Sequence, residues 1–192
     1  MRRLLTLVAI AAASLGLSAC TLVPVTPGPE AISPRTVPFG LLGKSIPGTD
    51  NGRVTFITQP VYIVDATGHL APSSRIVPAP PTLLSVLREL ILGPTAIETG
   101  TGYTSAIPEN VVIEQASVIH GIGVIDVPRP LASIPRPQLV MAIGQLVYTA
   151  AAVGATRGIE IEAAGTPERL PTPRGGLTTI ANEAEYRPLL NG

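Results

Sequence analysis

The sequence predicts an α/β (α+β) domain in which a single mixed sheet is covered by two helices. Apolar side chains repeat at helical spacing in residues 82–93 and 137–153, which predicts two amphipathic helices. Short β-branched segments around them give the order β-β-α-β-β-α-β. One sheet is the simplest surface on which both helices can bury their apolar stripes, and a three-layer sandwich with helices on both faces is the alternative.

The first two strands are predicted in the segment VYIVDATGHLAPSSRIVP. Residues 61–64 are β-branched or aromatic, which suits a pleated surface. Residues 65–68 (DATG) are typical of a turn. Because Pro72 cannot donate a backbone hydrogen bond, the second strand should be irregular or lie at an edge.

The first helix is predicted in PPTLLSVLRELILGP. Thr82 can cap its start, Gly93 can take the left-handed conformation just beyond its end, and Pro94 stops it. The predicted apolar stripe consists of Leu83, Leu84, Leu87, Leu90 and Ile91.

A hairpin is predicted after the Gly/Thr-rich loop of residues 98–110. The segment VVIEQASVIHGIGVIDVP contains two apolar runs with a turn near His120 and Gly121.

The second helix is predicted in PQLVMAIGQLVYTAAAV, with Pro137 at its first position and Gly154 after its end. The next segment, GIEIEAAG, alternates strictly, so Ile159 and Ile161 should point inward and Glu160 and Glu162 outward. From residue 166 onward we expect loops and at most a short final element. The helix stripe consists of Leu139, Ile143, Leu146, Ala150 and Val153.

The single cysteine of the chain, Cys20, follows a cationic start and an uncharged apolar run of residues 4–17. The run has the length of a signal-peptide core. Leu17, Ser18, Ala19 and Cys20 resemble the lipobox of bacterial lipoproteins, in which the cysteine thiol is acylated after small residues have admitted the peptidase. We therefore expect a lipoprotein signal peptide (1–19), a Pro-rich tether (20–53) and a domain (54–192). A simple secretory signal followed by an incidental cysteine is the alternative.

This arrangement predicts a chain anchored by lipid to the outer face of the cytoplasmic membrane. Without Arg2 and Arg3 the chain keeps 11 basic and 13 acidic residues, a net charge of −2. A nucleic-acid partner is not expected, because such partners need a basic surface. His69 and His120 are too isolated to predict a metal site, and no cofactor is expected.

Five motifs together resemble the GerMN (sporulation and spore germination) domain, of the short actinobacterial lipoprotein type. They are LRELILGPT, TSAIP, GVIDV, QLVYT and GIEIEAAG, in the family's order, with VPFGLL before them and EYRPLL after them. His120-Gly121 and Ala164-Gly165 replace the family's Asp-Gly turns. The resemblance implies a ring-building-motif-like fold and a non-enzymatic module of the cell envelope, tied to cell-wall processes, sporulation or envelope signalling.

No catalytic residues are predicted. Ser105 with His120 could form a dyad, and Glu114 with Asp126 could form a carboxylate pair across the hairpin, but turn and surface roles account for them more simply. Asp126 lies in an apolar run, so we expect it to cap backbone amides. An envelope hydrolase of peptidoglycan or ester bonds and a lipid or small-molecule carrier are the alternative functions.

We expect the domain to act by contact with an envelope protein partner or with a second copy. The surface predicted for this contact combines the loop after the first helix with the hairpin turn, and any unpaired sheet edge could contribute. Its residues are Thr99, Gly100, Gly102, Tyr103, His120 and Gly121.

Overall fold

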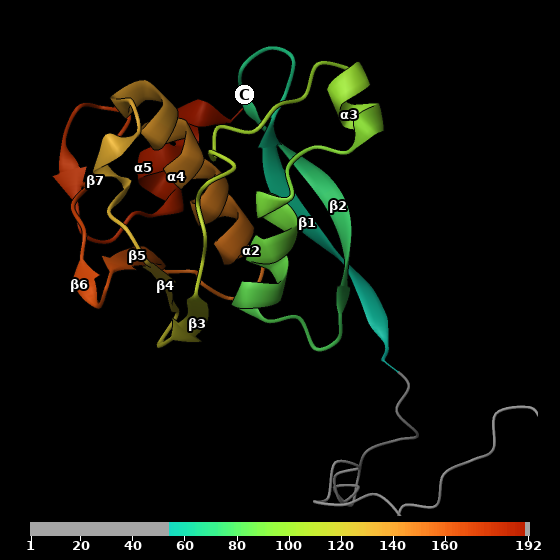
Figure 1. Cartoon of the computed structure of the whole chain (residues 1–192), viewed down its shortest axis with the longest axis horizontal. Helices are drawn as coiled ribbons and strands as arrows, with labels where there is room; N and C mark the ends of the chain where they lie inside the picture. The colour runs from blue at the N-terminus through green and yellow to red at the C-terminus, as the bar shows by residue number, and fades with distance from the viewer. Residues whose placement is uncertain (1–53, 191–192) are drawn as a thin grey trace, which may run out of the picture. The chain divides into compact units, whose positions relative to one another are not determined.

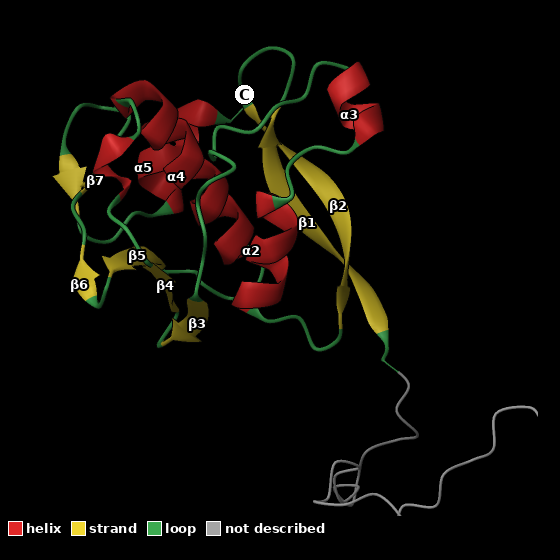
Figure 2. Ribbon diagram, in the orientation of Figure 1, coloured by secondary structure: helices red, strands yellow, loops and turns green. Residues whose placement is uncertain are grey.

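Small sheets and helices make up the part of the chain that this computed structural model describes, residues 54–190 (Figures 1 and 2). The strands are β1 (Phe56–Val64), β2 (Leu70–Pro78), β3 (Gln115–Ile119), β4 (Ile122–Val127), β5 (Gly158–Ala163), β6 (Thr166–Pro167), β7 (Leu170–Pro171) and β8 (Leu177–Thr178). The helices are α2 (Leu83–Ile91), α3 (Ala96–Gly100), α4 (Arg136–Ala151) and α5 (Glu183–Tyr186), with the 3₁₀ turns η2 (Leu131–Ser133) and η3 (Arg187–Leu189). The α+β class and the predicted order of the main elements are confirmed.

Both predicted helices form, and local chemistry sets their ends. Thr82 Oγ1 accepts the Ser85 N–H at 3.1 Å, which caps α2, and Gly93 follows its end with a φ of 75°. Pro137 was predicted to be the first residue of the second helix. Helix α4 begins one residue earlier, at Arg136, so Pro137 is its second residue. Helix ends commonly differ by one residue from a sequence pattern, because the flanking residue can adopt helical angles too.

The prediction of a single sheet is wrong, because the described strands divide into three sheets: β1-β2, β3-β4-β5-β6 and β7-β8. The edge of β1 that faces away from β2 meets a helix instead of a strand. Tyr62 N–H donates to Thr149 Oγ1 and Gln145 Nε2 donates to Tyr62 C=O, both at 2.9 Å. Next to them, Val64 and Thr104 exchange backbone hydrogen bonds of 3.0 and 2.8 Å. These groups pair the backbone of Tyr62 and Val64, so no further strand pairs at this end of β1.

The two long helices connect the β1-β2 hairpin to the four-stranded sheet. Helix α4 contacts both β1 and β5, and α2 contacts β1, β2, β3 and α4 (Figure 1). The core lies among these elements and is mainly aliphatic. Four residues from the predicted inward faces, Leu87, Leu90, Ile143 and Ile161, are fully buried in it.

In the four-stranded sheet the predicted register of β5 is confirmed. Ile159 and Ile161 are fully buried, whereas Glu160 and Glu162 are half-buried. Strand β5 runs parallel to β4, with α4 as the connection between them, and β3 pairs antiparallel with β4. The turn from β3 to β4 has His120 at φ 51° and Gly121 at φ 81°, the left-handed pair that a two-residue hairpin turn requires.

The last residues are more ordered than the sequence predicts. Tyr186, at the end of α5, is fully buried and donates from its hydroxyl to the Pro171 carbonyl at 2.7 Å. Burial raises the pKa of the Tyr186 hydroxyl. Leu190 then pairs with Leu70 as an isolated parallel bridge. The closing segment therefore completes the core rather than trailing from it.

Replacing Gln145 by Leu should lower the free energy of unfolding by about 2–5 kcal/mol. Gln145 is fully buried, accepts the Ala106 N–H at 2.8 Å and donates to Tyr62 C=O, so both backbone groups lose a partner in a dry interior. Urea denaturation measures the change. On the same helix, Gln138→Leu removes only an exposed hydrogen bond to Ala106 C=O and should cost less than about 1 kcal/mol. Equal losses would contradict the role given to Gln145.

Candidate binding cleft and interaction surfaces

The structure does not bring Ser105 and His120 together as a catalytic dyad. Ser105 Oγ donates to Gln145 Oε1 at 3.5 Å and accepts the Ile107 N–H at 3.2 Å. His120 lies in the exposed β3-β4 turn, where its carbonyl accepts a bond from Arg157 Nη1 at 3.3 Å. No hydrogen bond joins the two side chains among the described residues. Ser105 is therefore part of the Gln145 network, and His120 is a turn residue.

The proposed carboxylate pair is not formed either. Asp126 lies opposite Gln115 on β3 and Glu162 on β5, and Glu114 contributes only its backbone N–H, which donates to the Asp126 carbonyl at 3.0 Å. Asp126 is half-buried, and its Oδ1 is buried without a hydrogen-bond partner among the described residues. The expectation that Asp126 caps backbone amides is therefore wrong, because the amides next to it are used in the strand ladders. Among residues 54–190 no cluster of His, Cys, Asp and Glu could hold a metal ion.

The surface predicted for partner contact divides into two separate regions. Thr99 and Gly100 end the short helix α3, and Gly102 and Tyr103 follow it. His120 and Gly121 lie in the β3-β4 turn, which is on another side of the fold from α3 (Figure 1).

Helix α3 is fixed to β2 by the one ion pair among the described residues. Arg75 Nη2 lies 2.8 Å from Glu98 Oε2, Arg75 Nη1 donates to Glu98 Oε1 at 3.1 Å, and Ser73 Oγ also donates to Oε1. Glu98 Oε2 accepts the Thr95 N–H as well, which closes the capping box of α3. These bonds, that from Arg75 first, lower the pKa of Glu98 to about 2.

Two exposed aliphatic side chains accompany this ion pair, and the sequence analysis missed both. Leu92 at the end of α2 is 76% exposed and Ile97 on α3 is 82% exposed. For Leu92 the available signal was its position outside the predicted apolar stripe of α2. Both side chains add exposed apolar surface to the α3 region, as Val118 and Ile119 do beside the β3-β4 turn.

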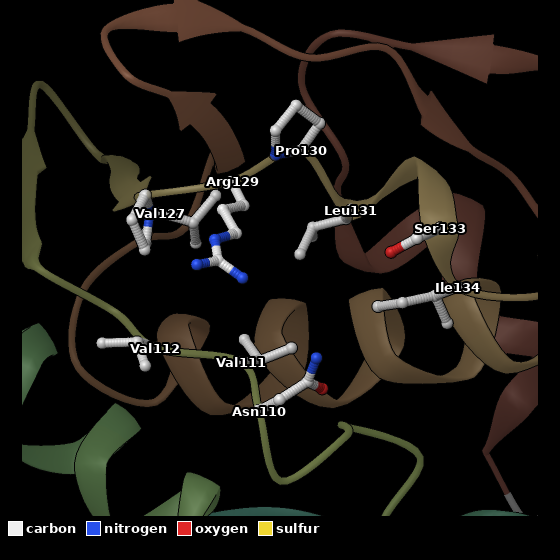
Figure 3. A pocket seen from close by; sticks show the side chains of 10 residues that line it. Asn110, Val111, Val112, Val127, Arg129, Pro130, Leu131, Ser133 and Ile134 are labelled. Atoms are coloured by element: carbon white, nitrogen blue, oxygen red, sulfur yellow. The ribbon is translucent and has the colours of Figure 1, made fainter.

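A cleft of about 400 Å³ opens at the base of the β3-β4 hairpin. One wall is formed by residues 110–112, before β3, and the other by residues 127–134, after β4. Figure 3 shows the two walls facing each other, with α4 behind them. The strands separate here because Pro128 and Pro130 have no N–H to continue the ladder that ends near Asp126.

Arg129 carries the single charge in the lining of this cleft. Its guanidinium group extends between the two walls, with Val127 and Leu131 on one side and Val111 on the other (Figure 3). The side chains of Arg129, Asn110 and Ser133 form no hydrogen bond or ion pair with another described residue. The sequence analysis did not single out this segment, although a Pro-Arg-Pro sequence directly after a strand indicates a place where strand pairing stops.

Comparison with known proteins places the fold and the family. The model of the family described as Germane, sporulation and spore germination, matches residues 60–169, more than half of the 192 residues. The chain belongs to this family. The GerMN resemblance found in the sequence is thereby confirmed, and a search of curated proteins gave no match.

Solved GerMN structures share the fold of this family member. The first GerMN domain of the sporulation protein GerM from Bacillus subtilis matches with a TM-score of 0.50 and 12% identity, over 67% of this chain and 98% of that one. The tandem GerMN domains of the same protein match with a TM-score of 0.51 and 11% identity, over 67% of this chain. The chain spans about half the length of the tandem structure, 47% of it.

The GerMN-like domain includes both walls of the cleft, since residues 110–112 and 127–134 lie inside the matched range. The Gln145 network and the Arg75–Glu98 pair lie inside it too. Within residues 54–190, no helix has the length and apolar character that crossing a membrane requires. Cys20 and its motif lie outside the described residues.

The Glu98→Gln variant tests the ion pair through its pH dependence. Because the folded pKa of about 2 is below the reference value of 4.5, the stabilisation is present above about pH 4.5 and is lost as the pH falls through about 2. The shift corresponds to about 3 kcal/mol, and solvent screening near the surface reduces the expected contribution to about 2 kcal/mol.

Urea unfolding of wild type and Glu98→Gln between pH 7 and pH 2 measures this difference. The gap in stability should be largest at pH 7 and close as the pH falls below about 4. The exposed Glu109, which has no ion-pair partner among the described residues, provides the control variant Glu109→Gln, and this should follow the wild type throughout. A gap that stays constant with pH would show that the ionised carboxylate is not what holds α3.

Proposed function

We propose that this protein is a lipid-anchored, extracytoplasmic member of the GerMN family that works by binding and not by turnover. The Leu17–Cys20 motif carries the proposal, because a lipobox directly after a cationic, apolar leader serves one known chemistry, acylation of the cysteine. A lipidated amine and thiol together give the two or three acyl chains that a stable anchor needs. The family match supports an assembly or contact role in the envelope, linked to sporulation or germination.

The predicted tether would set how far from the membrane the domain acts. Residues 20–53 contain six prolines, Pro24, Pro27, Pro29, Pro34, Pro38 and Pro47. At ~3.1 Å per residue, an extended Pro-rich segment of this length reaches roughly 100 Å. Anchoring at such a height keeps the domain at a high local concentration near envelope partners, so a modest interface suffices.

The partner is proposed to be an envelope protein or a second copy of the chain. The α3 region offers exposed Ile97, on a helix that Arg75 and Glu98 hold in place, and exposed Leu92 just after α2. Strand β3 offers a second route, because it is an edge of the four-stranded sheet and most of its residues are exposed.

A hydrolase of peptidoglycan or ester bonds is the second candidate, and one observation favours it. The buried Oδ1 of Asp126 has no partner among the described residues, and unsatisfied carboxylates occur at catalytic sites. Ser105, in contrast, has its hydroxyl engaged with Gln145.

Lipidation is tested by the mass of the mature protein from membranes. The N-terminal residue should be Cys20, with the added mass of acyl chains, and Cys20→Ser should leave the precursor uncleaved and unacylated. Ser18→Thr, which keeps a small residue before the cysteine, is the control and should be processed. A wild-type protein of unmodified mass would refute the anchor.

Turnover is tested with the full chain on purified cell wall, glycan and ester substrates. No product above background is expected from the wild type. Should product appear, Asp126→Asn and Ser105→Ala identify its source. Activity that either variant abolishes would replace the binding proposal with the hydrolase.

A further inference from the structure

We propose that the cleft at the base of the β3-β4 hairpin binds an extended, apolar peptide segment that ends in a carboxylate. This inference rests on the proposed function only in that the domain acts by binding. It does not depend on the lipid anchor. Three features of the cleft support it: the separated strands, the charge of Arg129 and the apolar lining.

The separated strands leave backbone groups available for an added strand. Between Val111 and Glu114 the chain is not part of a sheet, and the backbone groups of Val112 and Ile113 form no hydrogen bond with described residues. On the opposite wall Pro128 and Pro130 have no N–H to donate to the carbonyls of Val112 and Ile113. Extended peptides commonly bind by pairing with such unpaired main-chain groups.

The charge of the lining selects an anionic group at one end of this segment. Arg129 extends into the cleft and has no carboxylate within salt-bridge distance among the described residues, where Arg75–Glu98 is the one ion pair. A guanidinium group binds a carboxylate through two parallel N–H···O bonds, a geometry that ammonium groups cannot supply. The hydroxyl of Ser133 and the amide of Asn110 lie in the same lining and can complete the contact.

The remainder of the lining suits aliphatic side chains. Val111, Val112, Leu131 and Ile134 contribute apolar surface, and Val112 is 55% exposed without a partner in the described part of the chain. Binding clefts typically combine such apolar walls with a small number of polar groups, in volumes from ~300 Å³ upward. A cleft of about 400 Å³ therefore accommodates the last few residues of a peptide and not a folded domain.

Binding is measured with the full chain in detergent solution and two matched pools of fluorescent hexapeptides. In both pools the last three positions are drawn from Val, Ile, Leu and Phe. One pool has a free C-terminal carboxylate and the other a C-terminal amide. The free-acid pool should bind about tenfold or more tightly than the amidated pool, because a charge-assisted pair is lost with the carboxylate. Arg129→Gln should remove this preference.

The control is Arg88→Gln, an exposed arginine on α2 whose side chain forms no hydrogen bond or ion pair with other described residues, and it should bind as the wild type does. Equal binding of the two pools, or equal behaviour of Arg129→Gln and Arg88→Gln, would overturn the proposal. Binding of oleate that depends on Arg129, without peptide binding, would assign the cleft to a lipid and would also overturn it. Thermal unfolding of each variant confirms that Arg129→Gln is folded.

Each result can be separated from the test of the proposed function. An unacylated Cys20 with carboxylate-dependent peptide binding would refute the anchor and keep the cleft. An acylated Cys20 without peptide binding would refute the cleft and keep the anchor.

Discussion

The architecture depends on how the outer edge of β1 is closed. A two-stranded hairpin is marginal by itself, and its free edge would leave backbone groups unpaired. Here Gln145 and Thr149 of α4 bond to the backbone of Tyr62, and Gln145 also holds the Ala106 N–H of the loop after α3. One buried amide thus connects the hairpin, the central helix and that loop. Since α4 also contacts β5, the position of the four-stranded sheet relative to the hairpin follows from the same helix.

Local sequence patterns predicted most helices and strands. They could not predict how the strands pair, because pairing depends on contacts between residues far apart in the sequence. The Thr82 cap of α2 and the alternation of Ile159 and Ile161 follow from spacing alone, and both are as predicted. The stripe of α2 is only partly as predicted, because Val86 is fully buried while Leu84 and Ile91 are half-buried. The number of sheets was not predictable in this way, because it depends on Gln145 and Thr149 reaching a strand more than eighty residues earlier in the chain. A Gln and a Thr within an apolar helix were the available signal, since buried polar side chains need partners.

The same holds for the candidate sites: the local role of a residue could be predicted, but its neighbours in the fold could not. Turn residues such as His120 were placed correctly as turn residues, but their distance from α3 required the fold. The cleft beside Arg129 results from two prolines that stop one ladder, and the pairing of β3 with β4 had to be known before that effect could be located. Asp126 was expected to cap amides, yet the neighbouring amides serve the strands on both sides of it.

The burial of Tyr186 has a consequence for the order of events during synthesis. Its ring fills the core, its hydroxyl bonds to Pro171, and the nearby Leu190 pairs with Leu70 of the first hairpin. The earliest and latest parts of the described chain therefore meet in the finished domain. Until Tyr186 and Leu190 have left the ribosome, β1 and β2 lack part of their packing, and the nascent chain cannot reach its final stability.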